Sequence, residues 1–143
     1  MKILLISYII EASGMDVYKL DKFEHIYAVD CFDKEFSKMT NERLSDEPPY
    51  PRFQKWLISR LSILDKMGKN AIKLEGFEDL ASNNPKLFSI RYPHSKLNPR
   101  VIYACFMDSE IILLTAFKEE NAKSDYSKAM KKAAKRYKTL DSD

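Results

Sequence analysis

The chain has 143 residues, 45% of them hydrophobic and 31% charged, and its formal net charge is +3. This length suits one domain with a hydrophobic core and leaves little material for a second, so we expect a single domain over residues 1–143. The two cysteines, Cys31 and Cys105, each lie in an apolar segment, away from any CxxC or Cys/His cluster. This placement argues against a disulfide framework or a metal site and favours buried free thiols in a reducing cytoplasm.

The charge is unevenly distributed along the chain. Residues 1–85 carry 12 basic and 14 acidic side chains, whereas residues 86–138 carry 12 basic and 5 acidic ones. A concentrated positive region can bind a polyanion such as nucleic acid, although a solvated, lysine-rich surface explains the same composition.

The first residues, MKILLISYII, resemble a short signal peptide. However, Glu11 follows directly, no small-x-small cleavage site is present, and the apolar run is too short to span a bilayer as a helix. We therefore expect a strand or an ordered arm, no membrane partner, and a cytoplasmic protein. Residues 1–23 form an N-terminal extension to which the sequence assigns no role.

Residues 25–30, HIYAVD, alternate as a first strand, and the segment 31–44 changes to helical spacing. A second helix is expected from Pro51 to a glycine cap at Gly68. Its apolar residues repeat at intervals of three and four and predict a core-facing stripe: Phe53, Trp56, Leu57, Leu61, Leu64 and Met67.

Residues 73–80, KLEGFEDL, lose helical periodicity, and we interpret them as a connection. Strands are then expected over 87–93, 100–106 and 110–117. Ser124 is a plausible N-cap for a final helix with an apolar face. The rest of that helix is basic and includes Lys128, Lys131, Lys132, Lys135, Arg136 and Lys138. The order β-α-α-β-β-β-α predicts an α+β fold with a small, mainly antiparallel sheet, packed by two N-terminal helices and a basic C-terminal helix.

Several familiar site motifs are missing from the sequence. It has no GxGxxG, GxxxxGK[ST], GxSxG or HExxH pattern, and it has three glycines in all. Nucleotide cradles and nucleophile elbows are therefore not expected, and neither a metal nor an organic cofactor is implied.

Three cations lie at predicted strand ends: Arg91, Arg100 and Lys118. In an antiparallel sheet the end of one strand adjoins the start of the next, so these side chains are expected to converge. Arginine holds phosphate through two parallel hydrogen bonds and stays charged at any working pH. The convergence suggests RNA cleavage, in which the substrate's own 2′-hydroxyl attacks phosphorus and the protein stabilises the charged transition state.

His94, in the loop before the Arg100 strand, is the candidate for proton transfer near neutral pH. Each of these residues also has a purely structural explanation. Arg91 can pair with a surface carboxylate, Lys118 can pair with Glu119 or Glu120, and His94 has no evident partner in the sequence.

The ordered series KLEGFEDL, LFSIRYP and PRVIYACFMDSEIILLTAFKEE, with the closing helix rich in alanine and lysine, resembles the RelE/HigB-like toxin superfamily of type II toxin–antitoxin modules, in particular its phage-derived branch. The similarity covers roughly residues 24 to 138. It implies a ribosome-dependent messenger-RNA endonuclease whose partners are the ribosome, messenger RNA and a cognate antitoxin protein that covers the basic site in a hetero-oligomer.

By position, the resemblance assigns Arg91, Arg100 and Lys118 to the catalytic site, with His94 added as above. It matches Lys73 to a basic position before the leucine–glutamate–glycine turn. The RNA-binding candidates are Lys73, Lys96 and Lys123.

The chain departs from the pattern of this branch after Lys118, where Glu119 and Glu120 replace further lysines. These carboxylates favour two alternatives. One is a ParE-like inhibitor of DNA gyrase, and the other is a catalytically inactive homologue that binds only the antitoxin.

Overall fold

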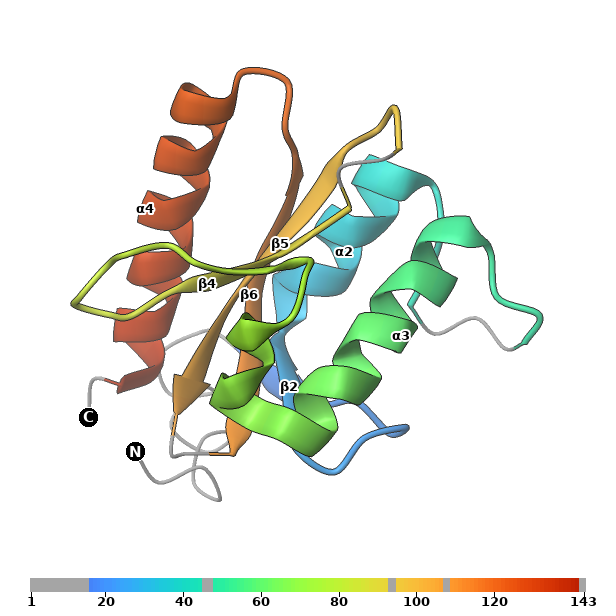
Figure 1. Cartoon of the computed structure of the whole chain (residues 1–143), viewed down its shortest axis with the longest axis horizontal. Helices are drawn as coiled ribbons and strands as arrows, with labels where there is room; N and C mark the ends of the chain where they lie inside the picture. The colour runs from blue at the N-terminus through green and yellow to red at the C-terminus, as the bar shows by residue number, and fades with distance from the viewer. Residues whose placement is uncertain (1–15, 45–47, 93–94, 107–108, 142–143) are drawn as a thin grey trace.

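The computed structural model describes residues 16–44, 48–92, 95–106 and 109–141 (Figure 1). These residues form an α+β fold in which three α-helices and a 3-10 helix pack on a six-stranded sheet. The elements in chain order are β1 (Val17–Lys19), β2 (Ile26–Val29), α2 (Asp30–Thr40), α3 (Arg52–Met67), the 3-10 helix η2 (Gly68–Lys73), β3 (Phe77–Asp79), β4 (Phe88–Arg91), β5 (Pro99–Phe106), β6 (Glu110–Lys118) and α4 (Ala122–Asp141).

The strands are arranged in the order β1-β2-β6-β5-β4-β3. The pairing of β2 with β6 is parallel, and every other pairing is antiparallel. The predicted α+β fold with a mainly antiparallel sheet is confirmed. Its central pair is the apolar hairpin β5–β6, in which Val101, Ile102 and Tyr103 are fully buried beside Ile111–Leu114.

Two edge strands were not predicted. Residues 17–19 of the N-terminal extension form β1 and pair with β2. The interpretation of residues 73–80 as a connection is wrong for Phe77–Asp79, because these residues form β3 and pair with β4. Both strands have three residues, too few for alternation to stand out from the surrounding loop.

The helix boundaries differ from the predictions by a few residues. α2 ends at Thr40, four residues before the predicted end, since Asn41 takes a left-handed conformation (φ 62°) and donates its backbone N–H to the Ser37 carbonyl. α4 begins at Ala122, so Ser124 lies inside the helix and the predicted N-cap is wrong. The Asp125 carboxylate instead accepts the backbone N–H groups of Glu120 and Asn121, each at 2.7 Å.

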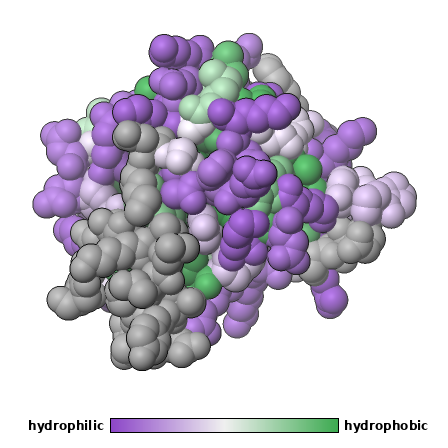
Figure 2. All heavy atoms as spheres, turned by 90° about the horizontal axis from the view of Figure 1, so that it is seen from below, coloured by the Kyte–Doolittle hydropathy of each residue, from purple (hydrophilic) through white to green (hydrophobic). Residues whose placement is uncertain are grey.

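The helices cover the two faces of the sheet. α4 stands on one side, and α2 and α3 stand on the other (Figure 1). Phe117 of β6 meets Tyr126 of α4 edge to face, with ring centroids 5.2 Å apart, and α3 contributes Trp56, Leu57, Leu61 and Leu64 to the core. Met67 is 37% exposed, so the buried apolar stripe predicted for this helix ends at Leu64, one turn earlier. Figure 2 shows polar side chains over much of one face, with apolar atoms only in small patches.

Cys31 and Cys105 are both free and partly buried. Burial raises the pKa of the Cys105 thiol to about 11 even though the charge of Lys69 opposes the shift. Within the described residues, no helix is both long enough and apolar enough to cross a membrane.

Candidate functional site

The three predicted cations lie at one end of the sheet. Arg91 of β4 is directly opposite Arg100 of β5, and Lys118 of β6 is opposite Pro99 of β5. Residues directly opposite each other project to the same face, so Arg91 and Arg100 share the face that α4 covers. Phe117 is opposite Arg100, and the alternation along β6 therefore sends Lys118 to the other face. The predicted convergence is therefore wrong for Lys118.

Arg100 is buried, with 3% of its side chain exposed. Its Nη2 atom lies 2.5 Å from Oε2 of Glu119, and the same oxygen accepts a hydrogen bond from Asn98 Nδ2 at 3.0 Å. Burial by itself raises the pKa of Glu119. The hydrogen bonds from Arg100 and Asn98 and the charges of Arg100 and Arg91 outweigh that effect, so the pKa is lowered and the carboxyl is ionised near neutral pH.

The loop before β5 holds this pair in place. Asn98 has a left-handed conformation (φ 54°), which turns its carbonyl toward the Glu119 backbone N–H at 3.1 Å. The Ser95 hydroxyl accepts the Asn98 N–H at 3.0 Å. The β4–β5 loop and the turn after β6 are thus joined through backbone and side-chain contacts.

Arg91 is more open, with 40% of its side chain exposed, and its Nη1 atom lies 3.8 Å from Glu78 Oε2. The other Glu78 oxygen accepts the Ser89 hydroxyl at 3.0 Å and the Tyr126 hydroxyl at 3.4 Å. Burial raises the pKa of Tyr126, so its hydroxyl is protonated near neutral pH. This hydroxyl group and Phe117 bring the first turns of α4 over the two arginines.

Lys118 is 53% exposed and pairs with Glu120 at 3.5 Å. Every predicted cation at the strand ends therefore has a carboxylate partner from this chain. We call these residues the strand-end cluster: Arg91 with Glu78, Arg100 with Glu119, and Lys118 with Glu120. The sequence left open that Arg91 pairs with a surface carboxylate and that Lys118 pairs with Glu119 or Glu120. The structure shows such an ion pair for each of the two cations.

The remaining predicted residues are less closely associated with the cluster. His94 lies outside the described residues. Lys96, in the loop before β5, and Lys123, in the first turn of α4, are exposed. Lys73, at the end of η2, is also exposed and lines a separate hollow of about 450 Å³ together with Lys69, Lys86 and Phe88. Phe88 is at the opposite end of β4 from Arg91.

Arg136, which the sequence places with the lysines outside the apolar face of the last helix, is mostly buried. Its side chain is 16% exposed. The guanidinium donates two hydrogen bonds to the Glu35 carboxylate of α2, at 2.8 and 2.9 Å, and one to the Leu114 carbonyl of β6, at 2.7 Å. Glu35 also accepts the Thr115 hydroxyl at 2.9 Å. Arg136 follows Ala133 by three positions, so helical spacing already placed it beside the apolar face.

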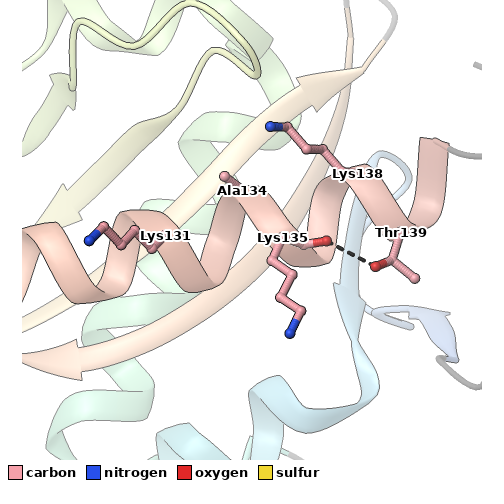
Figure 3. A pocket seen from close by; sticks show the side chains of 5 residues that line it. All are labelled: Lys131, Ala134, Lys135, Lys138 and Thr139. Carbon is pink, nitrogen blue, oxygen red and sulfur yellow. Dashed lines mark hydrogen bonds between the residues drawn. The ribbon is translucent and has the colours of Figure 1, made fainter.

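The outer surface of α4 carries a second basic feature. Lys131, Lys135 and Lys138 are exposed and line, with Ala134 and Thr139, a shallow hollow of about 560 Å³ (Figure 3). Their ammonium groups point away from the helix, and none of the three forms a salt bridge with a described carboxylate. We call these three residues the α4 lysines. Unlike the strand-end cluster, they have no carboxylate partner among the described residues.

Among the described residues, no three His, Cys, Asp or Glu side chains gather closely enough to hold a metal ion. Comparison with protein-family models, with curated proteins and with solved structures finds no match to this chain.

Proposed function

We propose that the protein is the toxin of a type II toxin–antitoxin module, related to the RelE/HigB-like superfamily, and that it cleaves messenger RNA on the ribosome. The observation that carries the proposal is the placement of Arg91 directly opposite Arg100, on one face and at one end of the sheet. The sequence resemblance independently assigned both residues to the site. The α+β fold with its mostly antiparallel sheet supports the proposal at the level of fold class.

In this proposal the RNA 2′-hydroxyl attacks the adjacent phosphorus, and the bond to the 5′-oxygen of the next nucleotide breaks. Negative charge grows on the phosphoryl oxygens during this step, and Arg91 and Arg100 stabilise it. Arg91 is the more accessible of the two. His94 transfers the proton that the 2′-hydroxyl loses to the departing 5′-oxygen. Lys118 adds positive charge from the opposite face of the sheet.

The α4 lysines supply contacts to the RNA backbone in this proposal. No described carboxylate pairs with them, and the phosphates of a nucleic acid neutralise such charges with release of counterions. Lys73 of η2 and Lys96 of the loop before β5 add basic side chains from other elements, and Lys123 adds one from the first turn of α4. The antitoxin, in turn, is a protein that covers the basic site.

A second candidate function is favoured by one specific observation. Each cation of the strand-end cluster already has a carboxylate within 3.8 Å, which reduces its attraction for phosphate. These carboxylates are expected if the protein is a relative without nuclease activity. Such a relative would act by binding another protein, either DNA gyrase or only the antitoxin.

The deciding experiment adds the purified protein to a cell-free translation reaction and maps messenger breaks by primer extension, with a ribosome-free reaction alongside. We expect breaks that require ribosomes, that are lost in Arg91→Ala, and that persist in Arg43→Ala. Arg43 is a matched control because it is an exposed arginine next to α2, far along the chain from the cluster. Intact messenger, with growth arrest of cells that express the protein, would instead favour the second candidate, and a gyrase supercoiling assay would then follow.

The contribution of the α4 lysines is tested through the salt dependence of RNA affinity. Replacing Lys131, Lys135 and Lys138 together by Gln should reduce the slope of log affinity against log salt by about 2 to 3, if each lysine neutralises one phosphate. The matched control replaces three exposed lysines of α2 and α3: Lys34, Lys38 and Lys66. Equal slopes for the two triple variants would remove α4 from the RNA surface.

A further inference from the structure

The Arg100–Glu119 contact leaves the arginine incompletely bonded. Arg100 uses only Nη2 for its contact with Glu119, and its Nε and Nη1 atoms are buried without a partner among the described residues. A buried donor without an acceptor costs free energy, and the cost is greater when the donor is charged. A single carboxylate oxygen is therefore a poor match for this guanidinium.

We propose that Arg100 and Asn98 form a binding site for one RNA phosphate group and that Glu119 occupies this site in the free protein. A ligand phosphate then binds by displacing the Glu119 carboxylate from the guanidinium. The inference deepens the proposed function and rests on it for the identity of the ligand as an RNA phosphodiester.

A phosphodiester can satisfy more of these donors than Glu119 does in this structure. Its two non-bridging oxygens match the planar fork of a guanidinium, which donates two parallel hydrogen bonds, whereas Glu119 accepts from Arg100 through one oxygen. Asn98 Nδ2, now bonded to Glu119 Oε2 at 3.0 Å, becomes available to the same ligand. Arg91, half-exposed on the neighbouring strand, adds a second charge on the same face.

The position of Glu119 allows the exchange. It follows the last residue of β6, and its side chain is 16% exposed, against 3% for Arg100, so the carboxylate lies closer to solvent. The next residue, Glu120, is 72% exposed. Glu119 can therefore swing outward by rotation about its own side-chain bonds, without movement of the strands. Because its pKa is lowered, it competes as an anion near neutral pH.

The test measures binding separately from cleavage. The probe is a fluorescent 2′-O-methyl RNA oligonucleotide, which lacks the attacking hydroxyl and is not cut, and its affinity is read by fluorescence anisotropy. Glu119→Gln is nearly isosteric and removes the competing charge, so we expect it to bind the probe about 10-fold more tightly than the wild type. Glu120→Gln is the matched control and should change the affinity by less than about 2-fold, because its pair with Lys118 is exposed.

Adding Arg100→Lys to Glu119→Gln should return the affinity to about the wild-type value, since an ammonium group does not present the planar fork. Thermal unfolding of each variant is recorded first. If Glu119→Gln is unfolded at the assay temperature, Glu119→Asp, which retracts the carboxylate by one methylene, replaces it and should shift the affinity in the same direction.

The two levels of the proposal fail in different ways. Equal affinities for Glu119→Gln, Glu120→Gln and the wild type would overturn the inference, even if the wild type cuts messenger on the ribosome. Tighter binding by Glu119→Gln supports the phosphate site whether or not any messenger is cut. In that case, the absence of ribosome-dependent breaks counts only against the proposed nuclease.

Discussion

Replacing Arg136 by Ala should destabilise the protein by about 2–3 kcal/mol. Arg136 ties α4 to two other elements, with two bonds to Glu35 of α2 and one to the Leu114 carbonyl of β6. Removal of one partner from a buried ion pair typically costs about 3–5 kcal/mol, because the other charge is left unpaired. We reduce this figure because the two side chains keep 16% and 19% exposure. Glu35 also retains its contacts with Thr115 and Lys132.

Urea unfolding followed by circular dichroism measures this loss. With a slope of about 2 kcal/mol per molar urea, the midpoint should fall by about 1 M. Lys135→Ala is the control, since Lys135 is exposed on the same helix and its removal should change stability by less than about 0.5 kcal/mol. The reasoning fails if the two variants unfold at the same urea concentration.

A double-mutant cycle assigns the loss to the pair. In a Glu35→Gln background the cost of Arg136→Ala should be smaller by about 1 kcal/mol or more, because the unpaired charge is no longer present. An unchanged cost would mean that the bond to Leu114 or the packing of the arginine stem is responsible.

Three further outcomes are expected. Gly76→Ala should cost about 1–3 kcal/mol in urea unfolding, because Gly76 has φ +92° and an added Cβ would lie 3.4 Å from the Arg60 guanidinium. Burial by itself raises the pKa of Glu35, but its hydrogen bonds to Arg136 outweigh that effect and lower the pKa. The stability difference between the wild type and Glu35→Gln should therefore be fully present above pH 4.5 and should disappear as the pH falls through the folded-state pKa of Glu35. A pH-independent difference between their urea midpoints would refute this. In a Cys31→Ala variant, Cys105 should react with a thiol reagent at pH 8 about 100-fold more slowly in the native protein than in urea. The reason is that burial raises the pKa of the Cys105 thiol to about 11 from an ordinary value of 9.0. Equal rates in the two conditions would contradict this.

The local pattern was sufficient for most of the fold. Apolar residues at helical spacing predicted α3, and the hairpin β5–β6 was evident from two apolar runs joined by a short turn. The same rules missed β1 and β3, because strands of three residues carry too little periodicity. Both are recognisable only from the neighbouring strands whose free edges they cover.

For the candidate site, the sequence alone determined which cations lie at strand ends and that those ends meet, since these follow from strand order and antiparallel pairing. Only the tertiary structure decided what neutralises the cations and how accessible they are. Arg100 is buried against Glu119, and Arg136 is held by Glu35, a residue 101 positions away in the chain. Such pairs depend on helices and strands packing together in space, and neither composition nor spacing along one element contains that information.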